Sequence, residues 1–66
     1  MNAIERNRKK VGKTQAELAD ELGVTQGNIS QWENGIAFPR MNKLPELAKA
    51  LDCSIDELFS ENERPA

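Results

Sequence analysis

A three-residue connection constrains the fold of this chain more than any other feature. Gly23-Val24-Thr25 separates two segments, 15–22 and 26–33, whose apolar residues recur at helical spacing. Thr14 and Glu17 form a capping box ahead of the first segment, and the threonine of the connection can cap the second. Two short helices joined this tightly cannot lie antiparallel and must cross at a steep angle. The sequence therefore predicts a helix-turn-helix.

Three further helices are predicted around this unit. Apolar spacing predicts a helix over residues 3–11. Because Pro45 is tolerated only in the first turn of a helix, we expect a short turn at 41–44 and a regular helix at 45–51. A second capping-box spacing, at residues 54–57, begins a short fifth helix. No stretch alternates as a strand does, so the predicted fold class is all-α.

Length and composition limit the chemistry. The chain has 66 residues, one cysteine and no histidine. One cysteine cannot close an internal disulfide, and the usual zinc sites and histidine-assisted nucleophiles need histidine. We therefore expect no metal, no cofactor and no enzymatic activity. A chain this short forms one domain, which we place at residues 1–60, with the helix-turn-helix at about 14–33 and a frayed tail at 61–66.

Two aromatic side chains are expected in the core. Trp32 lies on the same helical stripe as Ile29, and a tryptophan there is more often core than a platform for bases. Phe38 precedes a proline, which holds it extended, and we expect it to pack against the core.

Neither a membrane span nor a secretory signal is apparent. No apolar run approaches the roughly 18 residues that a bilayer span needs, and the first ten residues are mostly polar and charged. We expect a soluble, cytoplasmic protein. The net charge of −2, taken alone, argues against nucleic-acid binding, because affinity for a duplex depends on lysine and arginine. The acidity is mainly a property of residues 52–63.

Several motifs occur at a characteristic joint spacing. They are Thr14-Gln15-Ala16-Glu17-Leu18-Ala19, Leu22-Gly23-Val24-Thr25, Ile29-Ser30, Trp32-Glu33-Asn34-Gly35, Pro39 and Leu47-Ala48-Lys49-Ala50-Leu51. Together they resemble the Cro/cI-type (XRE) helix-turn-helix family of phage and bacterial repressors, over about residues 4–59. The resemblance implies a compact five-helix lambda-repressor-like domain and a Cro-like regulator that represses transcription by occupying an operator. It also implies a partly buried, structural ion pair between Arg8 and Glu33.

Three residues depart from the family pattern. Lys13 stands where an apolar residue is usual, so we expect thinner packing under the first loop. Arg40 replaces the common Ser or Thr that caps the fourth helix. Gly27 leaves one usual base-reading position without a side chain.

The outward face of segment 26–33 is the candidate reading surface. At about 100° per residue, with Ile29 and Trp32 inward, the outward side chains are uncharged and rich in amides. Gln and Asn can bond adenine N6 and N7 in the major groove, and a glycine admits a thymine methyl. The alternative is a plain polar helix face. The candidate base-reading residues are Gln26, Gly27, Asn28, Ser30 and Gln31.

A second set of residues is expected to contact phosphates and thereby to set the position of the domain on DNA. It consists of Gln15, Thr25, Asn34, Arg40 and Lys43, with Lys9, Lys10 and Lys13 as weaker candidates. For the cationic members, ordinary surface charge is the alternative.

Double-stranded DNA is the expected partner, bound at a near-palindromic operator by a homodimer. We place the subunit contact around Met41, residues 51–55 and Phe59, and we expect it to be weak in solution and to form on DNA. The alternative function is an antitoxin or protein adaptor that uses the same fold, gripping its partner through the fourth and fifth helices.

Overall fold

The computed structural model describes residues 3–59, and within this range every regular element is helical. The elements are α1 (Ala3–Lys10), α2 (Gln15–Leu22), α3 (Gln26–Glu33), a short 3-10 turn (Met41–Lys43), α4 (Leu44–Ala50) and α5 (Ile55–Phe59). The prediction of an all-α fold with five helices is confirmed. The predicted frayed tail lies outside the described residues.

The predicted helix boundaries agree closely with the structure. α2 and α3 begin and end at the predicted residues. α1 ends one residue earlier than predicted, and α4 begins and ends one residue earlier, at Leu44 and Ala50. Pro45 lies in the first turn of α4, where its missing N–H leaves no hydrogen bond unmade.

The connection between α2 and α3 forms as its residue types predict. In the capping box before α2, the Glu17 N–H donates to Thr14 Oγ1 at 3.0 Å, and the Thr14 N–H donates to Glu17 Oε1 at 2.8 Å. Gly23 ends α2 with φ 70°, a left-handed conformation that favours glycine. Thr25 then accepts from the Asn28 N–H at 3.1 Å and so begins α3.

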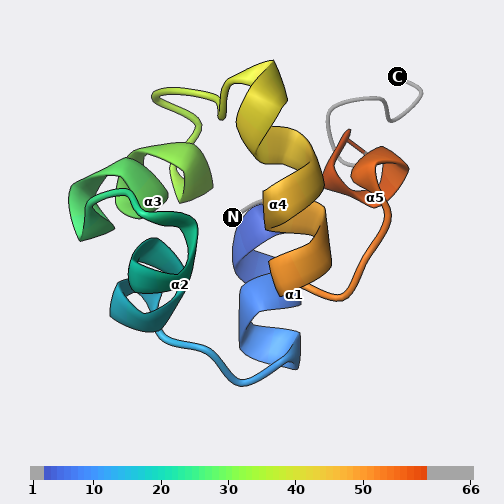
Figure 1. Ribbon diagram of the computed structural model, residues 1–66, viewed down its shortest axis with the longest axis horizontal. Coiled ribbons are helices and arrows are strands. Elements are labelled where there is room, and N and C mark those ends of the chain that lie inside the picture. The colour runs from blue at the N-terminus through green and yellow to red at the C-terminus, as the bar shows by residue number, and fades with distance from the viewer. Residues whose placement is uncertain (1–2, 60–66) are drawn as a thin grey trace.

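All five helices share one core. Leu18 of α2, Ile29 of α3 and Leu47 of α4 are completely buried, and Ile4 of α1 and Leu58 of α5 are nearly so. Trp32 is buried among them, as its place on the inward stripe predicts. Figure 1 shows α2 and α3 on one side of the domain, α1 and α4 in the middle and α5 at the opposite edge. The helix-turn-helix is therefore supported from one side only, and α3 lies at a free edge.

Two apolar side chains differ from their predicted placement. Phe38 is 44% exposed, so the prediction that it packs against the core is wrong. The buried residue of the loop is the following Pro39. Leu51 is only 1% exposed, because it continues the inward stripe of α4 one turn beyond Leu47. It therefore cannot belong to a surface patch.

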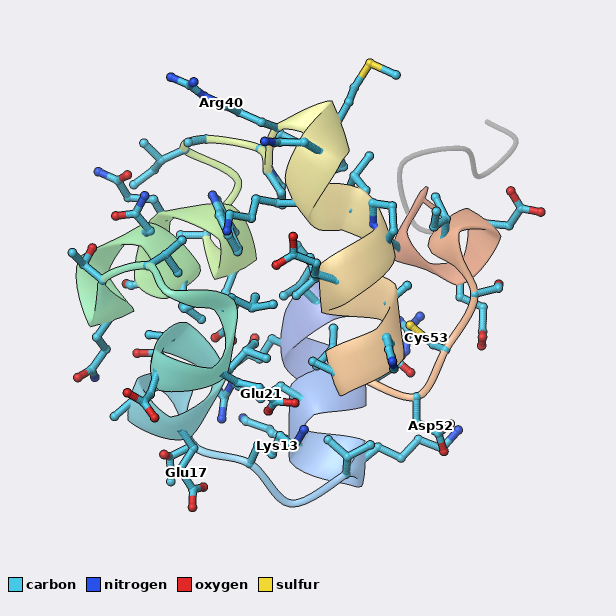
Figure 2. The ribbon with its side chains drawn as sticks, in the orientation of Figure 1. Lys13, Glu17, Glu21, Arg40, Asp52 and Cys53 are labelled. Carbon is cyan, nitrogen blue, oxygen red and sulfur yellow. The ribbon has the colours of Figure 1, made fainter. Side chains whose placement is uncertain are left out.

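Lysine side chains close the carboxyl ends of two helices. Lys13 Nζ donates to the Ala50 carbonyl at 2.8 Å and to Glu21 Oε1 at 2.7 Å; Figure 2 shows Lys13 and Glu21 turned toward each other. Lys43 Nζ donates to the Leu22 carbonyl at 2.9 Å. Each ammonium supplies a donor and a positive charge at the negative end of a helix dipole. The polar residue at position 13 thus joins α2 to α4.

No helix in the described part of the chain combines the length and the apolar character needed to span a membrane.

The same substitution at two glycines is expected to change stability in opposite directions. Gly23→Ala puts a Cβ on a left-handed residue with φ 70°, which should lower the free energy of unfolding by about 1–2 kcal/mol. Gly27 lies inside α3, where an added Cβ meets Thr25 Oγ1 at an ordinary 3.7 Å. Gly27→Ala should raise the free energy of unfolding by about 0.5–1 kcal/mol. Urea unfolding followed by circular dichroism measures the free energy of unfolding of both variants. Changes of the same sign would contradict the left-handed conformation of Gly23 or the helical position of Gly27.

Candidate nucleic-acid interface

The exposed face of α3 carries the predicted base-reading residues. Ile29, Trp32 and Glu33 turn inward and are buried. Gln26, Gly27, Asn28 and Gln31 are exposed and Ser30 is partly exposed, in the pattern predicted from helical geometry. This surface is uncharged, and Gly27 contributes no side chain to it.

A chain of polar contacts links the first residue of α3 to its last. Gln26 Nε2 donates to Gln15 Oε1 at 3.4 Å, and Gln15 Nε2 donates to Glu33 Oε1 at 2.9 Å. Gln15 is the first residue of α2, so the contacts pass from α3 through α2 and back to α3. The predicted phosphate ligand Gln15 is therefore engaged inside the helix-turn-helix as well as partly exposed at its surface.

Arg8 and Glu33 form the ion pair that anchors this chain of contacts. Arg8 Nε and Glu33 Oε2 are 2.5 Å apart, and Arg8 Nη2 donates to Glu33 Oε1 at 3.2 Å. Both side chains are largely buried, with 11% and 4% of their surfaces exposed. The hydrogen bond to Glu33 raises the pKa of Arg8 above its usual value, although burial acts in the opposite direction. Arg8 Nη1 also donates to the Lys13 carbonyl at 2.8 Å, which fixes the loop before α2.

Thr25 and Asn28 are tied together at the start of α3. The Thr25 hydroxyl accepts from the Asn28 N–H and donates to Asn28 Oδ1. Asn28 itself is exposed. At the other end of α3, Asn34 Nδ2 donates to Ser30 Oγ at 3.3 Å. Both predicted phosphate ligands at these ends, Thr25 and Asn34, thus border the exposed face of α3.

A surface pocket joins α3 to the segment that follows it. Its lining includes Asn28 and Gln31 of α3 together with Arg40, Asn42 and Lys43. Figure 2 shows the Arg40 side chain extending away from the body of the domain. Two predicted base-reading residues and two predicted phosphate-contacting cations therefore surround one hollow.

Sequence reasoning missed Asn42 and the exposure of Ile36 and Phe38. Asn42 lines the pocket, and its position beside Lys43 is the only sequence feature that indicates it. Ile36, Phe38 and Met41 are large apolar residues that remain exposed on the same loop and turn.

Two of the three weaker phosphate candidates, Lys9 and Lys13, have partners within the domain, whereas Lys10 is exposed on α1. Lys9 Nζ lies 3.2 Å from Glu5 Oε2 on the same helix, and Lys13 holds the end of α4. These contacts favour a structural role for both lysines.

The single thiol lies outside this surface. Cys53 follows α4 and is partly buried, and burial, Glu57 and Asp52 together raise the pKa of its thiol, with Lys10 acting weakly in the opposite direction. The reactive thiolate is therefore scarce at neutral pH. Within residues 3–59, no three acidic, cysteine or histidine side chains come together as a metal site.

Comparison with known proteins identifies the family. A family model described as helix-turn-helix matches residues 4–58, so the chain belongs to the helix-turn-helix family, as the sequence motifs indicate. It is 45% identical over 51 residues to the cryptic phage CTXphi transcriptional repressor RstR of Vibrio cholerae, which covers 77% of this chain and 46% of that protein.

Two further relatives carry related names. The chain is 44% identical over 56 residues to repressor protein C2 of Salmonella phage P22, covering 85% of this chain and 26% of the relative. It is 42% identical over 50 residues to the HTH-type transcriptional activator BcrR of Enterococcus faecalis, covering 76% and 24%. The chain thus matches less than half the length of each of these three relatives.

Proposed function

We propose that this chain is a sequence-specific DNA-binding transcriptional regulator, similar to Cro, that represses by occupying an operator. One observation carries the proposal: the second helix of the helix-turn-helix exposes an uncharged face of amides, Gln26, Asn28 and Gln31. A helix exposed only for solubility would carry paired lysines and glutamates. Two of the three relatives named above are repressors, which favours repression over activation.

α3 lies in the major groove in this proposal. Gln26 and Gln31 are the main readers, since a side-chain amide can donate to adenine N7 and accept from adenine N6. Asn28 and Ser30 are secondary readers. Gly27 lets the helix backbone or a thymine methyl approach closely.

Arg40 is the principal phosphate ligand. Its side chain is exposed beside the reading face. Lys43 uses one N–H on the Leu22 carbonyl and lies 3.6 Å from Glu46 Oε1, and the third N–H of its ammonium can reach a phosphate. Gln15, Thr25 and Asn34 supply neutral contacts that set the position of α3. Binding requires no metal or cofactor.

A two-fold pair of subunits reads a near-palindromic operator. A single helix-turn-helix contacts only a few base pairs, and two half-sites about one helical turn apart give useful specificity. Because Leu51 is buried, we place the subunit contact at Met41, which is 85% exposed, and at residues 52–55. The Phe59 side chain, also predicted to take part, lies outside the part of the chain that the structure describes. The working unit is the domain at residues 1–60, with its motif at about 14–33, in the cytoplasm of a bacterial or phage-infected cell.

The first functional prediction concerns base reading. Gln31→Ala should weaken binding to the operator by about 1–3 kcal/mol, because one bidentate base contact is lost. Binding to random DNA should hardly change. The operator is first selected from random-sequence DNA, and titration on both duplexes then measures the two affinities. An equal loss on both DNAs would show that Gln31 does not read bases.

The second functional prediction concerns Arg40. Arg40→Gln should weaken binding to all sequences and reduce the slope of log K against log salt by about one, since each phosphate contact contributes about 0.9. Lys49→Gln is the control, because it removes the same charge near the far end of α4. Titrations at several salt concentrations give the slopes. If both variants had the wild-type slope, Arg40 would not contact phosphate.

The third functional prediction concerns stoichiometry. The free protein should sediment as a monomer at micromolar concentration, because an interface well below about 1,000 Å² is weak. Two protomers should bind a full operator, and a half-site should bind much more weakly. One protomer bound to the full operator at undiminished affinity would exclude pairing.

A further inference from the structure

We propose that Glu33 is a positioning residue for base reading: its carboxylate sets the orientation of the Gln15 amide, and through Gln15 that of Gln26. The inference rests on the proposed function and adds to it a residue that does not touch DNA. Glu33 and Gln26 stand at opposite ends of α3, and the link between them passes through the first residue of α2.

The first step is the contact between Glu33 and Gln15. An ionised carboxylate accepts hydrogen bonds and cannot donate them. Glu33 is 4% exposed, and its carboxylate accepts hydrogen bonds from Arg8 Nε, Arg8 Nη2 and Gln15 Nε2. If the Gln15 amide were turned over, its oxygen would face the buried carboxylate, and two acceptors would meet without a proton between them. The Gln15 NH2 group must therefore face Glu33.

The second step is the contact between Gln15 and Gln26. With its NH2 group held by Glu33, Gln15 presents Oε1 to its neighbour and accepts from Gln26 Nε2 at 3.4 Å. One N–H of Gln26 is then turned toward Gln15. The other N–H and Oε1 remain available, and an adjacent donor and acceptor match N7 and N6 of adenine.

The opposite orientation would change what Gln26 reads. A Gln15 amide turned over would offer a donor to Gln26, which would turn Oε1 inward to accept it. Because Oε1 keeps a second lone pair, Gln26 would still expose one acceptor and one donor, but in exchanged positions, and this edge no longer matches N7 and N6 of adenine. Neutralising Glu33 therefore changes base preference at one position of the operator, whereas a purely structural role would change stability and affinity for every sequence.

The main experiment measures discrimination at two base pairs of the selected operator. Discrimination at a base pair is the ratio of the affinity for the operator to the affinity for the same operator with that pair replaced. Gln26→Ala and Gln31→Ala identify the pair that each glutamine reads. Glu33→Gln should reduce discrimination at the Gln26 pair by about five- to tenfold, a large share of one bidentate contact, and leave the Gln31 pair unchanged. Equal losses at both pairs, or no loss at either, would overturn the proposal.

Two variants separate orientation from stability. Arg8→Lys keeps the Glu33 carboxylate and a positive charge, so it should lower the melting temperature and preserve discrimination at the Gln26 pair. Gln15→Met removes the intermediate amide, and Glu33→Gln added to it should cause no further loss at that pair. A further loss in the double variant Gln15→Met with Glu33→Gln would overturn the proposal.

A second double variant is used if Glu33→Gln alone fails to fold. Arg8→Met combined with Glu33→Gln leaves no unpaired charge buried and tests the same step.

A measurement without DNA separates this inference from the proposed function. In NMR spectra of the free protein, the side-chain amide signals of both Gln15 and Gln26 should shift in Glu33→Gln. Gln31 serves as the internal control and should not shift. Unmoved Gln26 signals would overturn the inference even if the protein binds DNA. Shifted signals in a protein without sequence preference would contradict the proposed function alone.

Discussion

The buried carboxylate of Glu33 is the contact on which the arrangement of the first three helices depends. Arg8 reaches it from α1 and Gln15 reaches it from α2, while Glu33 itself ends α3. Removing one partner of a buried pair leaves an uncompensated charge, which costs about 3–5 kcal/mol. A domain of this size has few contacts with which to offset such a loss. The angle at which α3 is presented therefore depends on one acidic side chain.

α4 is joined to α2 in a different way, by lysine side chains that bind carbonyls at the ends of the two helices. Lys13 joins the carboxyl end of α4 to Glu21 on α2, and Lys43 joins the start of α4 to the carboxyl end of α2. Both contacts place an ammonium group on carbonyls at helix ends, which have no partner within the helix and cost free energy if they are buried without a donor. Because α4 is fastened to α2 at both ends, the segment that carries Arg40 keeps its place beside α3.

Local chemistry explains what could be predicted from the sequence. The boundaries of α2 and α3 are encoded within a few residues, by Thr14, Gly23 and Thr25, so they could be read without knowing the fold. The placement of Phe38 and the partners of Lys13 depend on residues distant in the chain, such as Ala50, which lies 37 positions from Lys13. The outward face of α3 follows from helical periodicity, whereas the link from Gln15 to Glu33 exists only in the folded structure.

Several of the positively charged side chains of this acidic chain make contacts within the domain, which affects how the chain can select DNA. Arg8, Lys13 and Lys43 hold helices together, and Lys9 pairs with Glu5. In the proposed complex the positive charge beside α3 comes from Arg40 and Lys43, and binding to random DNA rests on such phosphate contacts. Amide contacts add free energy only where the bases match. Because specificity is the ratio of operator binding to random binding, few cations and several amides favour a high ratio at modest affinity.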